Sequence, residues 1–570
     1  MTRPPDLIVL GRIASLAGED GFGWLEGLAV LDGRIVAAGR RHDIAALAGA
    51  TTRTMELAPA QVALPSVTDA HLHLVDAALA ADQVDLEGSS TLDVALERIA
   101  AAGMARLAQG DRDGWLLGHG WATDGWAARP TAADLERAAP GRRIALWSHD
   151  HHTMWLSMAA LADVGIEAST PDPVGGVIGR DVSGRPDGLL HEHAIDLVSA
   201  AIPRPSRAAI DDAVIRYARR LAAVGVTGVH DPGSLTADAT MAGGFSAIKA
   251  MAEDGRLPLH VHASIRDAQL EAAIDAGLRS GQGVEPRPGA DASERRAIDR
   301  FQVGWLKLFA DGSLGSRTAA MLEPYDDTST RPGPAGPQGG LLRSRAALSE
   351  RVERAAGAGL ATMIHAIGDQ AVRTALDAFE AVDARRLGAL ALVPRIEHAQ
   401  VVQKIDRGRF VRLGVAASVQ PIQLRRDLEA MRHAIGSRTA LAFPLASLAA
   451  AGTLLVFGTD APVEPPDPWP GLAMATTRWA PEWGTDVPPT EPSEGLTLDA
   501  ALRAATIGPH RSAGEPLAGR LVIGEAADLV IVALGDHDDP AGAAEAVRRV
   551  EPLLTLLDGQ ERYRAAGFDR

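Results

Sequence analysis

The chain has 570 residues, a formal net charge of −17 and a hydrophobic fraction of 46%, and it contains no cysteine. The absence of cysteine excludes disulfides, thiol nucleophiles and cysteine-ligated zinc, so a metal ion would need histidine, carboxylate or modified side chains. No cluster of Lys or Arg offsets the acidity, and we therefore expect no nucleic-acid partner.

Long apolar segments are missing from the sequence. No run of about 18 apolar residues occurs, so we predict no membrane-spanning helix. The apolar run 7–10 is too short for a secretory signal, and Gly11-Arg12 ends it. We expect a cytoplasmic protein.

The two ends of the chain have the pattern of short strands. Apolar segments in the first 60 residues are joined by a hairpin turn at Asp32-Gly33. The last 50 residues contain similar segments at 519–524 and 528–532, and a second Asp-Gly turn at Asp558-Gly559. We predict that both ends pair into one small β domain.

Between the ends, short apolar strands alternate with alanine-rich amphipathic stretches, which indicates βα units and a parallel sheet. Eight predicted strands each end at a polar residue: Val62–His71, Val226–Asp231, Leu259–Ser264, Trp305–Asp311, Thr362–His365, Arg395–His398, Val415–Gln420 and Leu454–Asp460. Eight is the number that a (β/α)₈ barrel needs, so we predict this α/β fold.

Two irregular stretches interrupt the barrel pattern. Residues 84–205 form an insertion after the first strand, and they contain five of the ten tryptophans and six histidines. The segment 312–340 is rich in Gly and Pro. Long loops on a barrel commonly serve as lids or binding loops.

Side chains able to bind metal ions stand where the predicted strands end. His71 and His73 are two residues apart, so on a strand they face the same side and can share one ion. Alone they could equally be a hydrogen-bonded pair in a loop. However, His365, His398 and Asp460 end other strands, and Lys307 lies in an apolar strand. Barrel enzymes place catalysis at this face, which favours a metal site.

A set of motifs in this order resembles the amidohydrolase superfamily, most closely its YtcJ-like branch, which includes N-substituted formamide deformylases. The matching segments are 69–73 (DAHLH), 225–231 (GVTGVHD), 307–319 (KLFADGSLGSRTA), 365–369 (HAIGD), 397–399 (EHA), 458–462 (GTDAP) and 524–530 (GEAADLV). The resemblance covers nearly the whole chain.

The resemblance implies a TIM barrel over residues 61–514, with residues 84–205 as an inserted lid, and a β-sandwich built from 1–60 and 515–570. It also implies one or two divalent metal ions, usually zinc. His71, His73 and Asp460 would hold the first ion, and His365 and His398 the second. Lys307 matches a lysine that related enzymes carboxylate with CO₂, and the resulting carbamate can bridge two ions. Dimers are common in such enzymes, so a homodimer is one expected assembly.

The implied reaction is hydrolysis of a non-peptide C–N bond in a small-molecule substrate, such as an N-acyl or N-formyl amide. A metal ion activates water, and Asp460 carries its proton to the leaving nitrogen. The structural alternative for Asp460 is a helix N-cap. A cyclic amide or an ester as substrate, and a non-catalytic regulatory homologue, stay open as alternatives. A deaminase is disfavoured because no His-Ala-x-Glu run is present.

Several further residues are candidates for substrate contact: Trp115, Trp121, His152, Asp311, Arg317, Tyr325 and Gln420. Arg317 could bind a carboxylate, or it could be a solvated loop charge. The two tryptophans could line the pocket, although core packing is the commoner use of this residue. His152 could bind substrate, or it could belong to a polar hairpin with His149 and His151.

Overall fold

The computed structural model describes residues 3–108, 110–111, 113–122, 126–148, 153–173, 176–199, 201–234, 244–286, 288–327, 335–534 and 540–568. These residues form two compact units. One unit combines Met1–Val75 with Ile215–Arg570, and the other is Asp76–Val214. The second unit includes the predicted insertion, residues 84–205. The finer division into domains stays a prediction.

Eight parallel strands of the first unit form the predicted barrel. In neighbour order they are β6 (Val67–Asp69), β13 (Val226–Asp231), β14 (His260–Arg266), β15 (Phe301–Phe309), β16 (Thr362–Ala366), β17 (Arg395–His398), β18 (Ala416–Val419) and β19 (Leu455–Phe457). The Ala70 N–H donates to the Phe457 carbonyl at 2.9 Å and joins the last strand to the first. The (β/α)₈ prediction is therefore confirmed.

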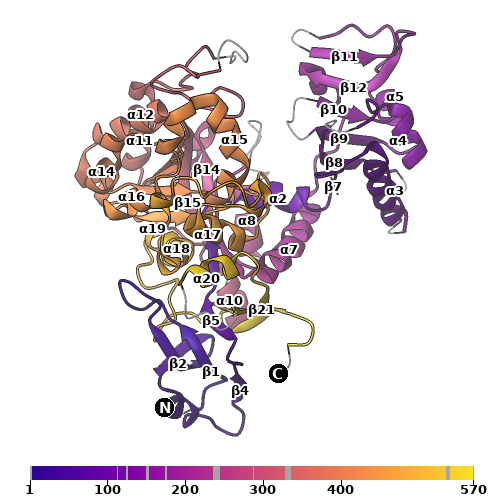
Figure 1. Cartoon of the computed structure of the whole chain (residues 1–570). Coiled ribbons are helices and arrows are strands. Elements are labelled where there is room, and N and C mark those ends of the chain that lie inside the picture. The colour runs from indigo at the N-terminus through magenta and orange to yellow at the C-terminus, as the bar shows by residue number, and fades with distance from the viewer. Residues whose placement is uncertain are drawn as a thin grey trace. The chain divides into compact units, whose positions relative to one another are not determined.

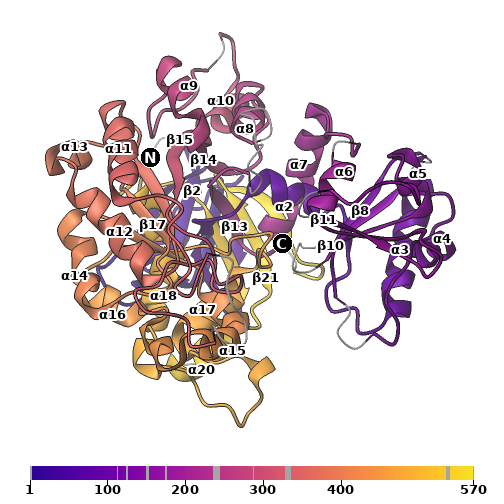
Figure 2. The same cartoon turned by 90° about the horizontal axis from the view of Figure 1, so that it is seen from above.

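Helices follow the barrel strands and lie outside them, as α11, α12 and α14 do in Figure 2. They are α8 (Phe245–Glu253), α9 (Leu270–Asp275), α10 (Ala292–Asp299), α11 (Arg345–Gly357), α12 (Asp369–Glu380), α13 (Ala384–Gly388), α14 (Lys404–Leu413), α15 (Leu424–Ile435), α16 (Leu445–Ala450), α17 (Pro468–Thr477), α18 (Leu498–Ala505) and α19 (Ile507–Ser512). In α12, Val372, Leu376 and Phe379 are buried. Their spacing of three to four residues gives the helix one apolar face.

Both chain ends contribute strands to one sheet of the first unit (Figure 1). Its strands are β1 (Leu7–Ala14), β2 (Trp24–Leu31), β3 (Arg34–Gly39), β4 (Arg53–Glu56), β5 (Gln61–Pro65), β20 (Leu529–Ala533), β21 (Pro552–Leu557) and β22 (Gln560–Arg564). The two ends meet where β5 pairs antiparallel with β20. Short helices α1 (Arg41–Ala45) and α20 (Pro540–Val547) accompany these strands.

The predicted first barrel strand, Val62–His71, is wrong in one respect, because it is two strands in different sheets. Residues up to Pro65 pair with β20, whereas Val67 begins the barrel strand β6. Ser66 lies at the junction: its N–H donates to the Asp528 carbonyl, and the next N–H, that of Val67, donates to Gly225. The change of partner between successive residues divides the apolar run.

The second unit contains a six-stranded sheet in the order β11-β12-β10-β9-β8-β7. Its strands are β7 (Val84–Asp85), β8 (Leu116–Trp121), β9 (Ile144–Ser148), β10 (Thr153–Leu156), β11 (Gly176–Arg180) and β12 (Pro186–Glu192). Its helices are α3 (Leu92–Ala108), α4 (Ala132–Ala138), α5 (Met158–Asp163) and α6 (Asp196–Ser199), while α2 (Leu74–Ala80) and α7 (Arg207–Ala223) cross its boundaries. The rings of Trp121, Trp126 and Trp155 lie 6.0–6.3 Å apart, so the tryptophans of the insertion build its core.

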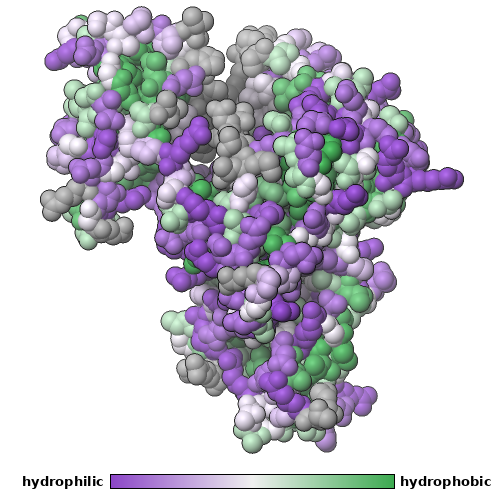
Figure 3. Space-filling model, turned by 180° about the vertical axis from the view of Figure 1, so that it is seen from behind, coloured by the Kyte–Doolittle hydropathy of each residue, from purple (hydrophilic) through white to green (hydrophobic). Residues whose placement is uncertain are grey.

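Within the described residues, no helix is both long and apolar enough to cross a membrane. On the face shown in Figure 3, hydrophilic residues are interspersed with smaller hydrophobic patches. The apolar side chains of the barrel strands are instead buried, as the nearly complete burial of β15 and β19 illustrates.

The close packing of α19 against the barrel strand β19 can be tested by substitution. A Cβ added at Gly508 would lie 2.3 Å from the Leu455 carbonyl oxygen, whereas one added at Gly388 in α13 would meet no atom within 4 Å. We expect Gly508→Ala to destabilise the protein by about 1–3 kcal/mol because the helix must shift. Gly388→Ala should leave the melting temperature unchanged or slightly raised. Equal melting temperatures in calorimetry would contradict this packing.

Candidate metal centre

Three predicted ligands meet where the first and last barrel strands end. His71 and His73 follow β6, Asp460 follows β19, and their candidate ligand atoms all lie within 4.8 Å of one another. Asp460 Oδ1 is 3.4 Å from His71 Nε2 and 3.3 Å from His73 Nε2. Backbone pairing continues beyond the strands, since the Asp460 N–H donates to the His71 carbonyl at 2.7 Å. The junction between the first and last barrel strands, which we call the seam of the barrel, therefore positions these three side chains.

The other predicted ligands lie beside these three. The rings of His365 and His398 are 4.5 Å apart, and the His398 ring is 5.1 Å from that of His71. Lys307 Nζ is 3.5 Å from His71 Nε2. The structure thus brings together all six predicted groups: His71, His73, Lys307, His365, His398 and Asp460.

Each imidazole of the centre has one nitrogen bound to a fixed acceptor. The Nδ1 atoms of His71, His73 and His398 pair with a Glu397 oxygen, the Gly233 carbonyl and Gln420 Oε1, respectively. His365 instead uses Nε2, which lies 3.1 Å from the Gly312 carbonyl oxygen. An N–H that donates to an oxygen leaves a lone pair on the other nitrogen, and metal-binding histidines typically have such partners.

Burial sets the protonation of the centre. It lowers the pKa of His71 to about 4 and that of His398 to about 3, so both imidazoles are neutral at pH 7. Burial also lowers the pKa of Lys307 to about 8. Metal ions bind neutral imidazoles and carboxylates. The side chains present therefore fit a divalent cation.

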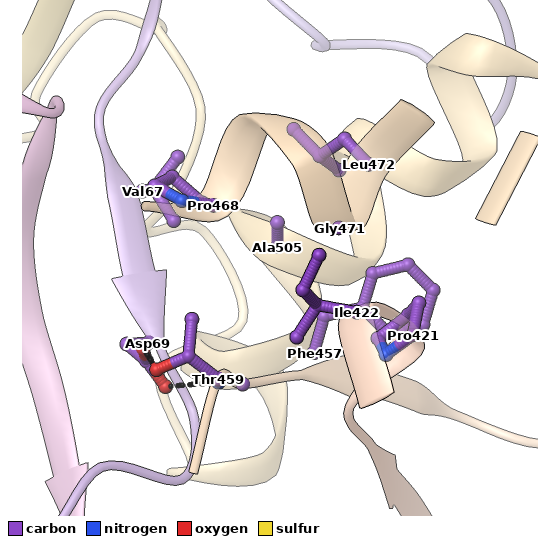
Figure 4. A pocket seen from close by; sticks show the side chains of 11 residues that line it. Val67, Asp69, Pro421, Ile422, Phe457, Thr459, Pro468, Gly471, Leu472 and Ala505 are labelled. Atoms are coloured by element: carbon purple, nitrogen blue, oxygen red, sulfur yellow. Dashed lines mark hydrogen bonds between the residues drawn. The ribbon is translucent and has the colours of Figure 1, made fainter. Parts of the chain in front are cut away.

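A buried carboxyl group ties the two segments of the seam together. Asp69 Oδ1 accepts the backbone N–H groups of His71 and Thr459 at 3.1 and 3.0 Å, and Figure 4 shows Asp69 hydrogen-bonded to Thr459. Behind it, apolar residues line a cavity of about 20 Å³, which has room only for a water molecule. Asp69 therefore holds the His71 segment beside the Asp460 segment.

Two ligands have backbones in the left-handed region. The φ angle is 68° at His398 and 65° at Asp460, a conformation that costs energy in non-glycine residues and is concentrated at functional sites. The N-cap alternative for Asp460 is not what the structure contains. The next helix, α17, starts at Pro468, and Asp467 caps it by accepting the Trp469 N–H.

Three predicted substrate contacts after β15 have internal partners instead. Asp311 is fully buried, and it accepts the N–H groups of Ala320, Ile367 and Gly368. Arg317 Nε lies 3.1 Å from an Asp327 oxygen. The hydroxyl of Tyr325 donates to the Ala319 carbonyl at 2.8 Å. These bonds order the loop after β15 and the turn that follows His365, so contact with substrate stays only a prediction for all three.

The remaining predicted contacts also differ in their surroundings. Trp115 and Trp121 are buried in the hydrophobic core of the second unit, the commoner use of tryptophan. Gln420 is fully buried and orients His398. His152 lies outside the described residues. A role in substrate binding stays untested for these four residues.

Sequence reasoning assigned no role to Glu397 or Asp69. Both stand next to or near predicted ligands in the sequence, and both are buried carboxyl groups that bind the His71 segment. For Glu397, the available signal was a pair of opposite charges, Arg395 and Glu397, two residues apart in a short predicted strand. On a strand that spacing places both on one face.

A second group of potential ligands lies elsewhere in the first unit. Candidate atoms of His260, Asp528 and Asp558 also lie within 4.8 Å of one another. However, Arg300 Nη2 is 2.6 Å from Asp558 Oδ2, and His260 Nε2 is 3.2 Å from Asp528 Oδ2. These carboxylates already have cationic or hydrogen-bonding partners, so we assign no metal ion to this group.

Comparison with known proteins agrees with this geometry. The model of the amidohydrolase family matches residues 61–563. Putative amidohydrolase YtcJ of Bacillus subtilis (strain 168) is 30% identical over 512 residues, covering 88% of this chain and 89% of the relative. N-substituted formamide deformylase of Arthrobacter pascens is 28% identical over 568 residues, covering 94% and 95%. The crystal structure of an uncharacterized metal-dependent hydrolase from Pyrococcus furiosus has a TM-score of 0.71 and 25% identity, covering 94% of this chain and 99% of that one. The chain belongs to the amidohydrolase family.

Proposed function

We propose that the protein is a zinc-dependent hydrolase that cleaves a non-peptide C–N bond, such as that of an N-acyl or N-formyl amide. The observation that carries the proposal is a carboxylate, Asp460, held against the imidazoles of His71 and His73 at the carboxyl end of the barrel. The similarity to an N-substituted formamide deformylase over 94% of the chain supports this class of substrate.

The side chains of the site have different roles in the proposed reaction. Divalent ions in such sites supply Lewis acidity, which lowers the pKa of water and polarises a carbonyl group. His71, His73 and Asp460 would hold one ion, and His365 and His398 a second. Asp460 Oδ2 accepts a hydrogen bond from Gln423 Nε2 at 3.1 Å, which orients the carboxylate. Asp460 takes a proton from the attacking water and gives it to the leaving nitrogen as the C–N bond breaks, so that acid and amine are the products.

Lys307 has the properties of a lysine that reacts with CO₂. Its side chain is buried and its pKa is lowered to about 8 by burial, so part of the population carries a neutral, nucleophilic amine at neutral pH. An ammonium group here would repel metal ions, whereas a carbamate is an anion with two oxygens. We therefore propose that Lys307 is carboxylated, and its carbamate oxygens would then help to hold the two ions.

Other substrates remain alternatives to an acyclic amide. A cyclic amide or an ester could be cleaved by the same groups, and a non-catalytic homologue could bind metal alone. The retained Asp460 disfavours the last of these. Assays of zinc-loaded protein against N-formyl amides, N-acyl amides, lactams and esters would distinguish an acyclic amide, a cyclic amide and an ester as substrate. No turnover of any of these compounds would favour the non-catalytic homologue.

We expect purified, zinc-reconstituted protein to contain close to two zinc ions per chain, because the site offers two groups of ligands. Elemental analysis after gel filtration measures this ratio. A catalytically active preparation without a divalent metal would contradict the proposed site.

We expect Asp460→Asn to lower kcat by at least about 100-fold, since the amide cannot accept the proton of water. Zinc content should change little, because the amide oxygen still reaches the ion. Asp427→Asn is a matched control, a half-buried carboxyl group of α15 that accepts a hydrogen bond from Gln400 Nε2 at 2.8 Å. Near-normal turnover in the Asp460 variant would refute the proton transfer.

Carboxylation of Lys307 can be tested by ¹³C NMR in ¹³C-bicarbonate. The chain has only three lysines, Lys249, Lys307 and Lys404, which makes assignment by single replacements simple. We expect one carbamate signal in metal-loaded protein that persists in Lys404→Arg and disappears in Lys307→Arg. An active, metal-loaded protein without this signal would argue against a carbamate.

A further inference from the structure

An ion pair lies inside the barrel beneath the metal centre. Arg395 and Glu397 project from β17, both are fully buried, and Arg395 Nε is 2.9 Å from Glu397 Oε1. Barrel interiors are normally filled by branched apolar side chains. A buried ion pair is often no more stable than apolar residues packed in its place. The pair therefore calls for an explanation other than stability.

Both members of the pair reach the segment that carries His71. The second oxygen of Glu397 binds His71 Nδ1, and Arg395 Nη2 donates to the Ala70 carbonyl at 3.0 Å. Glu397 thus accepts Arg395 Nε on one oxygen, and its other oxygen is placed to accept the Nδ1–H of His71.

Arg395 has one further partner, His230 of β13. Arg395 Nη1 lies 2.9 Å from His230 Nδ1, and the guanidinium lies over the Trp305 ring at 4.1 Å from its centroid. Arginine keeps its protons in proteins, so Nη1 donates and His230 Nδ1 accepts. This bond places the proton of the neutral imidazole on Nε2.

Burying the imidazole of His230 lowers the stability of the fold, because only one of its two ring nitrogens has a hydrogen-bond partner in the described part of the chain. His230 is 1% exposed, and its Nε2 has no hydrogen-bond partner among the described residues. A buried N–H without a protein partner lowers stability, which a phenylalanine of similar shape would avoid. The retained feature of the imidazole is thus the acceptor that it offers to Arg395.

We propose that Arg395 and His230 are positioning residues of the metal centre: His230 orients Arg395, Arg395 orients Glu397, and Glu397 fixes the tautomer and ring orientation of His71. Among the described residues, no hydrogen bond joins either side chain to a predicted metal ligand. The inference rests on the proposed metal site and extends it through two further residues. It predicts that breaking the chain of hydrogen bonds at its far end weakens metal binding.

Three variants separate positioning from simple packing. His230→Phe keeps the ring volume and removes the acceptor, whereas His230→Asn keeps an oxygen acceptor near the place of Nδ1. His262→Phe is the matched control, because His262 packs against His230 with ring centroids 4.8 Å apart and bonds Gln302 instead of Arg395. Zinc dissociation constants come from competition with a chelator, and the melting temperature of the metal-free form reports packing.

We expect His230→Phe to weaken zinc binding by about 10-fold or more, the usual effect of losing a residue that orients a ligand. His230→Asn and His262→Phe should bind zinc nearly as tightly as the unmodified protein, whatever their melting temperatures. If His230→Phe does not fold, Arg395→Lys, which keeps the charge but loses the three-way donor geometry, should show the same weakening.

Equal zinc affinity in His230→Phe, or in a folded Arg395→Lys, and the unmodified protein would overturn the inference and leave the proposed function intact. Weakening of equal size in His262→Phe would also overturn it, since general packing would then explain the effect. If the unmodified protein binds no metal in the same titration, the proposed function itself fails, and the inference fails with it.

Discussion

An imidazole has two nitrogens, and the candidate metal centre depends on fixing one of them. The Nδ1 atoms of His71, His73 and His398 each face an oxygen acceptor, so their Nε2 lone pairs are free for a cation. The acceptors differ in kind: a carboxylate, a backbone carbonyl and a side-chain amide. Each comes from a barrel strand or the segment directly after one, and the geometry of the barrel therefore becomes the geometry of the ligands.

Closure of the barrel brings Asp460 next to the histidines. The segments after β6 and β19 are joined by backbone hydrogen bonds and by Asp69, which binds both His71 and Thr459. Asp460 gains its position next to two histidines only because the first and last strands are neighbours. The buried pair of Arg395 and Glu397 extends this order into the barrel, where Arg395 also binds the backbone at Ala70.

Much of this organisation is visible in the sequence, because polar residues interrupt apolar strands at regular places. The strand over Arg395–His398 was predicted with the bounds that the structure has, and the six predicted ligands lie close together. The directions of other side chains were not predictable. Asp311 and Gln420 were named as candidate substrate contacts, and that role stays untested. Their partners in the structure, backbone N–H groups and His398, could not be read from the sequence, since only the tertiary fold decides which way a residue at a strand end turns. The split of the first strand at Ser66 was hidden for a similar reason, because two sheets share one apolar run.

The central claim is that oriented imidazoles at the barrel seam hold divalent ions. Anomalous diffraction from crystals of zinc-loaded protein, recorded on both sides of the zinc absorption edge, tests it directly. We expect one peak among His71 Nε2, His73 Nε2 and Asp460, and a second beside His365 and His398. Zinc bound only elsewhere, for example at His260 and Asp528, or no peak among these five side chains, would contradict the account.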